Sequence, residues 1–219
     1  MSFQAASGMF SRRKPGIRAM VVAAAALVLI VAMALDTKVV PIGSDVQPAT
    51  FSPEAFGAAE FPKIQAGIEQ RAVDAQTLAE AIAKDKDAAA KQYGMASTVG
   101  VGAEFSVKFT GVVGEGKSGV YVVAVQGIPD TITIKVQTGP AINGTSLRDA
   151  TGTIAFGQFV NQIEYQNAGS ALNKEMKKQV LAKIDTANLT GKTISVVGAY
   201  KLINPKNWLV TPVRLDIVP

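Results

Sequence analysis

Eight polar side chains that could recognise a ligand or move a proton fall between positions 143 and 165 of this 219-residue chain. Amides and carboxylates pair with hydroxyl groups, and an aromatic ring can stack on a sugar, so this mixture among apolar neighbours is typical of a site for a polar ligand or a partner. The candidate binding residues are Asn143, Thr145, Arg148, Asp149, Asn161, Gln162, Glu164 and Tyr165.

The same residues could instead hold the chain in place. Thr145 can cap a short turn, and Arg148 can form a buried ion pair with Asp149 or Glu164 that fixes a long connection against the rest of the domain. Buried polar groups in proteins are almost always hydrogen-bonded, which favours this structural role over a ligand site. An open cleft lined by the charged side chains would reverse that preference.

Catalysis by this segment would have to use Asp149 and Glu164 as an acid and a base, as glycosidases do. Nothing in the sequence sets the separation of the two carboxyl groups, so we predict that the protein is not an enzyme and has no catalytic residues. The chain also has no cysteine and no histidine. That composition excludes a thiolate nucleophile, a Ser-His-Asp triad, a His/Cys zinc site and a His-ligated haem. We therefore expect no metal and no cofactor.

The candidate residues lie in a long polar insertion, residues 139–167, between stretches that alternate apolar and polar residues as β-strands do. A helix capped by Ser170 should follow, with an apolar stripe from Leu172 to Ile184. Strands are predicted over residues 104–113, 120–125, 132–136, 193–203 and 213–218. Three strands, a helix and two strands is the order of the five-stranded Greek-key barrel called the OB-fold.

We therefore predict an α+β fold in which residues 103–219 form an OB-like five-stranded β-barrel with one helix between strands three and four. A plain α+β sandwich is the competing architecture. Ahead of the barrel, residues 52–94 predict two or three short helices, the first capped by Thr50 or Ser52 and another by Asp74. Pro62 should kink or restart the first helix because it has no amide hydrogen to donate.

Residues 17–35 carry one charge, Arg18, followed by seventeen residues that are all Ala, Val, Leu, Ile or Met. A helix of this length spans about 28 Å, close to the thickness of a bilayer's hydrocarbon core. We predict a transmembrane anchor here, after a cytoplasmic basic tail over residues 1–16 and before a linker over residues 36–51. Basic residues but no acid precede the anchor, so the positive-inside rule predicts a single-pass protein of the bacterial inner membrane with its C-terminal domain in the periplasm.

A secretory signal peptide cleaved after Ala34 is the alternative reading of the N-terminus. The apolar run is longer than the roughly 7–15 residues usual in a signal peptide, which favours an uncleaved signal anchor. A lipoprotein signal is excluded because acylation needs a cysteine. Beyond Leu35, 18 basic residues face 17 acidic ones. The exported part is therefore nearly neutral, and we expect no nucleic-acid partner.

Several motifs resemble an uncharacterised bacterial family of predicted periplasmic lipoproteins, a domain of unknown function (number 2291). The resemblance extends from about Gln47 to the C-terminus. It is carried by Gln137-Thr138-Gly139-Pro140, Ile142-Asn143-Gly144-Thr145, Leu147-Arg148-Asp149-Ala150, Asn161-Gln162-Ile163-Glu164-Tyr165 and Ala171-Leu172-Asn173. Members often lie beside genes for ribose-type ABC sugar importers, which implies an accessory role in carbohydrate uptake. This chain lacks the family's lipid-bearing cysteine, so the anchor would be the helix itself.

The leading hypothesis is a non-enzymatic periplasmic binding or accessory protein, anchored in the inner membrane. It would contact the permease or the substrate-binding protein of an ABC-type, ribose-like sugar transporter through residues 143–165. The alternative is a carboxylate-dependent enzyme that acts on cell-envelope glycans. Oligonucleotide binding by the barrel is disfavoured by the near-neutral charge and by the lack of interleaved basic and aromatic residues on any strand.

Overall fold

The computed structural model describes residues 16–37, 51–96 and 102–218. Most of the predicted basic tail, residues 1–16, and most of the predicted linker, residues 36–51, lie outside the described residues. The chain divides into two compact units, residues 1–50 and residues 51–219, and each is described by itself.

The described part of the first unit is the helix α1, Ile17–Asp36. It matches the helix predicted over residues 17–35, and its apolar side chains are exposed, Leu27 to 65% and Ile30 to 63%. Within the described ranges, no helix is both long and apolar enough to cross a membrane. The membrane span predicted for residues 17–35 is not supported by this finding.

Three helices open the second unit: α2, Pro53–Arg71, α3, Ala75–Lys84, and α4, Lys86–Tyr93. As predicted, Ser52 caps the first of them and Asp74 the second, each accepting a backbone N–H with its side-chain oxygen. Of the two outcomes expected at Pro62, a kink or a restart, the restart is wrong, since α2 continues through it. Buried Phe61 and Ile64 pack the helix onto the rest of the unit, which offsets the one hydrogen bond that proline cannot donate.

Seven strands among the described residues form one sheet. They are β1, Val73–Asp74, β2, Gly94–Ala96, β3, Ala103–Lys117, β4, Val120–Val125, β5, Thr133–Gln137, β6, Thr193–Lys201, and β7, Asn207–Val218. Strands β3, β4, β5, β7 and β6 pair in that order, and β6 pairs again with β3, so the hydrogen-bonded path returns to its start.

The five strands of this path correspond to the five predicted from the sequence, although β7 begins earlier than expected. The β5–β7 pair is parallel, and the other pairs on the path are antiparallel. The short strands β1 and β2 add to β3 and were not predicted, because two or three residues leave no periodic signal.

Aromatic side chains from the strands pack together in the hydrophobic core. Phe105, Tyr200 and Trp208 are fully buried, with ring centroids 5.7 Å apart between the first two and 4.8 Å apart between the last two. The β6–β7 register shifts next to Gly198, which is paired with Pro212. Proline has no amide hydrogen for a ladder bond, so the irregularity falls where regular pairing is already interrupted.

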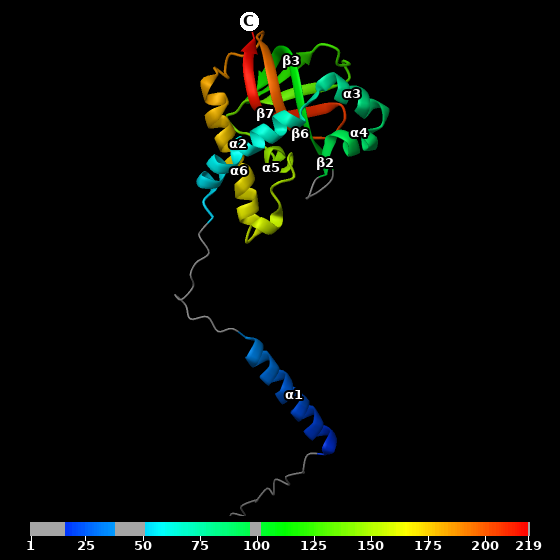
Figure 1. Ribbon diagram of the computed structural model, residues 1–219, viewed down its shortest axis with the longest axis vertical. Helices are drawn as coiled ribbons and strands as arrows, with labels where there is room; N and C mark the ends of the chain where they lie inside the picture. Colours follow the sequence, from blue (N-terminus) through cyan, green and yellow to red (C-terminus); the bar gives the residue numbers. More distant parts are fainter. Residues whose placement is uncertain (1–15, 38–50, 97–101, 219) are drawn as a thin grey trace, which may run out of the picture. The chain divides into compact units, whose positions relative to one another are not determined.

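The connection between β5 and β6 contains more helix than the sequence predicts. It holds a one-turn helix, α5, Ser146–Asp149, two short 3-10 turns, η1, Phe156–Gln158, and η2, Leu181–Lys183, and the long helix α6, Gln162–Gln179. The prediction that Ser170 caps a single helix is wrong, because α6 begins earlier with Asn161 as its N-cap. Polar residues in the first turns conceal the helical period. In Figure 1, α6 lies beside α2, which it contacts.

A glycine at the β3–β4 turn provides a first test of the fold. Ser118 and Gly119 form this turn with φ angles of 54° and 76°. A Cβ atom on Gly119 would lie 0.9 Å from the carbonyl oxygen of Gly139, so a side chain there must push two backbone segments apart. We expect Gly119→Ala to lower the free energy of unfolding by about 3 kcal/mol or more. Chemical denaturation followed by the fluorescence of Trp208, the sole tryptophan, measures this.

Gly144→Ala is the matched control. Gly144 also has a positive φ, 88°, but no atom lies within 4 Å of its added Cβ. The cost should be limited to backbone strain of about 1–2 kcal/mol. Equal losses for the two variants would contradict the close backbone approach at Gly119.

Candidate functional site

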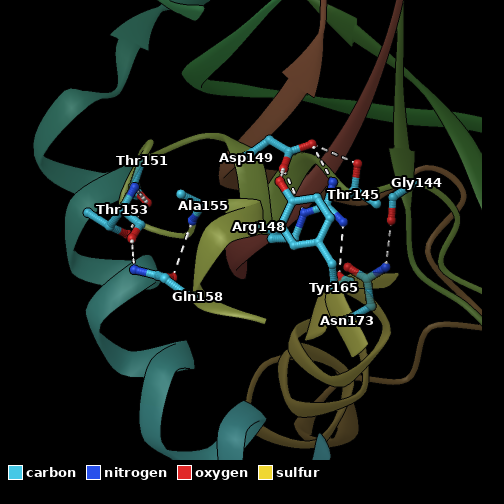
Figure 2. A network of polar contacts seen from close by, with 10 residues as sticks. All are labelled: Gly144, Thr145, Arg148, Asp149, Thr151, Thr153, Ala155, Gln158, Tyr165 and Asn173. Carbon is cyan, nitrogen blue, oxygen red and sulfur yellow. Dashed lines mark hydrogen bonds and ion pairs between the residues drawn. The ribbon is translucent and has the colours of Figure 1, made fainter. Parts of the chain in front are cut away.

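Arg148 and Asp149 lie at the centre of a buried polar network (Figure 2). The two residues are 2% and 5% exposed. Arg148 Nε donates to Asp149 Oδ1 at 2.7 Å, and Nη2 donates to Oδ2 at 3.0 Å, so the ion pair is bidentate. Adjacent residues do not face each other along a regular helix. Here α5 is a single turn, and the guanidinium folds back onto the carboxylate beside it.

Thr145 and Tyr165 complete the network. Thr145 Oγ1 donates to Asp149 Oδ2 at 2.8 Å, and the Tyr165 hydroxyl donates to Oδ1 at 3.4 Å. Arg148 Nη1 donates to the backbone carbonyl of Tyr165 at 3.1 Å, and the guanidinium carbon lies 3.6 Å from the centre of the Tyr165 ring. Every nitrogen of the guanidinium has a partner, as a buried charge requires. Because Tyr165 belongs to α6, the network ties α5 to α6.

Two buried amide side chains that the sequence analysis did not select pin the same connection. Gln137, at the end of β5, donates to the carbonyl of Asn143 at 3.0 Å and accepts from its N–H at 2.9 Å. Asn173, in α6, donates to the carbonyl of Gly144 at 3.0 Å. Both amides occur in the motifs that carry the family resemblance, and that is the sequence signal that could have found them.

Asn161 and Glu164 cap α6 and do not join the network. Asn161 Oδ1 accepts the backbone N–H of Glu164 at 2.9 Å, and Glu164 Oε2 accepts the backbone N–H of Val160 at 3.1 Å. This exchange is close to a capping box. Of the two acidic partners that the sequence allowed for Arg148, the structure selects Asp149.

Of the eight candidates, Thr145, Arg148, Asp149 and Tyr165 therefore come together. Asn143 and Gln162 lie on the surface, each on a different part of the connection. The eight residues do not converge on an open cleft, and the arrangement of these four is the structural alternative that the sequence allowed.

The connection also exposes apolar side chains. Phe156, Val160 and Ile163, which we call the outer tip, are 46%, 75% and 71% exposed. Beneath them Phe159 packs against Phe51 and Tyr165, with ring centroids 5.5 Å and 5.4 Å apart. Residues 139–167 thus turn the charges of Arg148 and Asp149 inward and these apolar groups outward, which is the reverse of an ordinary surface loop.

Glu104 is a buried carboxyl group close to the network. Alternation placed it on the polar face of β3, yet it is only 1% exposed. Neither carboxylate oxygen accepts a well-formed hydrogen bond within the described residues. Burial raises the pKa of Glu104 to about 7, and Asp149 adds to the rise, whereas Ser146, Lys201 and Arg148 oppose it. Sequence reasoning missed Glu104 because alternation shows which face a residue is on and not what covers that face.

The described residues contain no group of side chains that could hold a metal ion. A groove of about 560 Å³ has Tyr121, Pro140, Lys177 and Leu181 among its lining residues, and none of the eight candidates. Two of its polar side chains already have internal partners. Tyr121 donates to the carbonyl of Thr186 at 2.9 Å, and Lys177 donates to the carbonyl of Pro140.

Fold and site together define an α+β domain with a buried polar centre in its long β5–β6 connection. A family model described as "Predicted periplasmic lipoprotein (DUF2291)" matches residues 23–216. The chain belongs to this family, which confirms the resemblance carried by its motifs. The description assigns the family to the periplasm and, as lipoproteins, to a membrane. The cysteine that a lipid would require is absent from this sequence.

A solved structure supports the fold. An OB-fold protein from Thermotoga maritima superimposes with a TM-score of 0.62, covers 77% of this chain and 99% of its own, and is 19% identical in sequence. At this level of sequence identity, the similarity shows only that the two proteins share a fold. A comparison with curated proteins finds no match.

Arg148→Met tests whether the network is structural. Methionine keeps part of the side-chain volume but leaves the Asp149 carboxylate buried without its cation and close to a second carboxyl group, Glu104. We expect the free energy of unfolding to fall by about 3–5 kcal/mol, measured by chemical denaturation with Trp208 fluorescence.

Arg214→Met is the matched control, because Arg214 pairs with Glu69 at 3.1 Å while its side chain is 51% exposed. Solvent screens such a pair, so this variant should lose less than about 1 kcal/mol. The proposed structural role of Arg148 is refuted if Arg148→Met lowers the free energy of unfolding no more than Arg214→Met does.

Glu104→Gln should change how stability depends on pH. Between the unfolded pKa of 4.5 and the folded value of about 7, the folded state holds a proton that the unfolded state has released. The contribution of Glu104 to the free energy of unfolding is therefore fully present below pH 4.5 and is lost as the pH rises towards 7. The advantage of Glu104→Gln over the native chain should grow from pH 5 to pH 8 by up to about 3 kcal/mol.

The measurement is denaturation of both chains at the two pH values. Glu115→Gln serves as the control because Glu115 lies exposed at the end of β3. Its stability difference from the native chain should be the same at both pH values. A pH-independent difference for Glu104→Gln would show that the carboxyl group titrates normally in the folded state.

Proposed function

We propose that this protein is a membrane-anchored periplasmic binding or accessory protein that acts by contact and not by catalysis. Its partner is a component of an ABC-type, ribose-like sugar import system, either the permease or the substrate-binding protein, as the family resemblance implies. The observation that carries the proposal is that the side chains best suited to chemistry, Arg148, Asp149 and Tyr165, are occupied by one another.

The carboxylate enzyme of the sequence analysis lacks a geometric basis. A glycosidase needs two carboxyl groups that both reach the scissile bond. Asp149 is 5% exposed, its Oδ1 accepts a hydrogen bond from Arg148, and its Oδ2 accepts from Arg148 and Thr145. Glu164 is bound to the backbone at the start of α6. No observation favours this second function.

The helix α1 supports association with a membrane. Its apolar side chains are exposed, among them Leu27, Ile30 and Met33 at 62–65%. Moving one such side chain from water into an apolar phase is favourable by about 1.5–3 kcal/mol. We therefore propose that α1 holds the chain at the inner membrane, in the place of the lipid that a family cysteine would carry. Residues 51–219 would then lie in the periplasm.

The partner surface is proposed from the polar side chains that remain accessible in residues 143–165. Asn143 and Gln162 are exposed, and their amides can donate and accept hydrogen bonds to a protein surface. We also propose that the domain is an OB-like barrel. The five strand pairs form a closed path that includes the β3–β6 pair, which supports this architecture.

Isolation of the tagged full-length chain from its native membrane in mild detergent tests the partner. We expect the permease or the substrate-binding protein of a sugar importer to be recovered with it. Gln162→Arg should reduce that recovery because it places a long charged side chain within the proposed contact. Quantitative mass spectrometry of the bound fraction gives the measurement.

Gln126→Arg is the matched control, since Gln126 is an exposed glutamine outside the proposed surface. It should leave the recovery unchanged. Recovery of the native chain without any importer component would refute the partner.

The anchor is tested separately, because a chain held only by α1 should stay with the membrane after extraction at alkaline pH.

A further inference from the structure

The outer tip is unusual within the 51–219 unit. Val160 and Ile163, at 75% and 71% exposed, rank with Ile203 as the most exposed large apolar side chains among the described residues of this unit. Phe156, 46% exposed, lies beside them in the chain. Single exposed apolar residues need no explanation, but several in one short segment mark a contact surface.

The display of these side chains is fixed by internal bonds. Gln158 holds the η1 turn by accepting from the N–H of Ala155 and donating to the carbonyl of Thr153, both at 3.2 Å (Figure 2). The Glu164 carboxylate holds the N–H of Val160 at 3.1 Å. Phe159, between the exposed residues, packs inward on aromatic rings. The tip is thus a supported structure that presents apolar groups to its surroundings.

The tip also lies where the polypeptide enters the domain. Phe51, the first described residue of this unit, contacts Phe159 with ring centroids 5.5 Å apart. Figure 1 shows the segment between α5 and α6, in yellow, at the end of the domain where α2 begins. Asp36, the last residue of α1, precedes Phe51 by fifteen positions. A chain of that length reaches at most about 50 Å. In a domain tethered by α1, the attachment point beside the tip therefore cannot lie farther than about 50 Å from the end of the anchor.

Charge suits a lipid surface as well. Residues 150–173 contain one charged residue, Glu164, and its carboxylate is engaged with the backbone of Val160. Asn161, the N-cap of α6, is an exposed amide beside the tip. No free ion has to be desolvated when the tip enters the headgroup region, and the Asn161 amide can hydrogen-bond to lipid headgroups.

From these observations we propose that the outer tip is a second, peripheral membrane contact: Phe156, Val160 and Ile163 rest in the interfacial layer of an uncharged lipid surface and orient the domain on the membrane. This inference rests on the proposed anchoring by α1. The tether raises the local concentration of lipid at the tip, so that a contact too weak to bind the free domain becomes effective.

Because the chain has no cysteine, a single probe can be placed at will. The full-length chain carrying Ile163→Cys, labelled with an environment-sensitive fluorophore, is reconstituted into phosphatidylcholine vesicles that contain an acyl-chain quencher. Ile203→Cys is the matched control, since both isoleucines are 71% exposed. We expect most of the emission to be lost at position 163 and little at position 203. Val160→Asp in the Ile163→Cys chain should restore the emission, because a carboxylate resists the interfacial layer.

The outcomes separate the inference from the proposal that it rests on. A chain that fails to float with the vesicles refutes anchoring by α1. A chain that floats but is quenched equally at positions 163 and 203 overturns the lipid contact and leaves the anchor intact. Shielding of position 163 in native membranes but not in pure lipid vesicles would also overturn the lipid contact and assign the tip to a protein partner. Trp208 emission checks in each variant that the domain is folded.

Discussion

A buried guanidinium group sets the main physical constraint on this domain. Removing the charge of Arg148 from water costs several kcal/mol unless its N–H groups find partners. The chain supplies the Asp149 carboxylate, the Tyr165 carbonyl and the face of the Tyr165 ring. Because these partners come from α5 and α6, satisfying one side chain fixes the two helices against each other and shapes the whole β5–β6 connection.

The same constraint explains what the connection shows to its surroundings. Near the start of the connection, Gln137 and Asn173 bind the backbone of Asn143 and Gly144. Farther along, Glu164 binds the backbone N–H of Val160. Between residues 139 and 167, the charges of Arg148 and Asp149 are thus used inside, and amides and apolar side chains are left outside. A surface of this kind can make contact with lipid or protein. The proposed contact function follows from that division.

The periodic parts of the fold could be predicted from the sequence, and the parts decided by tertiary packing could not. Alternation identified the five strands of the closed path, and the caps at Ser52 and Asp74 were correct. The start of α6 was missed because its first turns are polar. These turns pack onto the domain through Tyr165, which contacts Arg148 and Asp149. Pro62 does not end α2, because burial of its neighbours outweighs the local preference of proline.

The candidate site shows the same limit. Composition found Arg148, Asp149 and Tyr165, because ionic and aromatic residues among apolar neighbours need either a ligand or one another. It could not choose between those outcomes, since the choice depends on which helices cover the side chains. Glu104 was missed for the same reason. A polar residue on the outward face of a strand is expected to contact water, but here Glu104 is buried next to Ser146 of α5.

The most direct test of the account is a double-mutant cycle on Arg148 and Asp149, with the free energy of unfolding measured for Arg148→Met, Asp149→Leu and the double variant. If the two charges exist to satisfy each other, removing both should cost several kcal/mol less than the sum of the single losses, because neither is left buried alone. Additive losses would contradict the account and would show that the pair is not the interaction on which the connection depends.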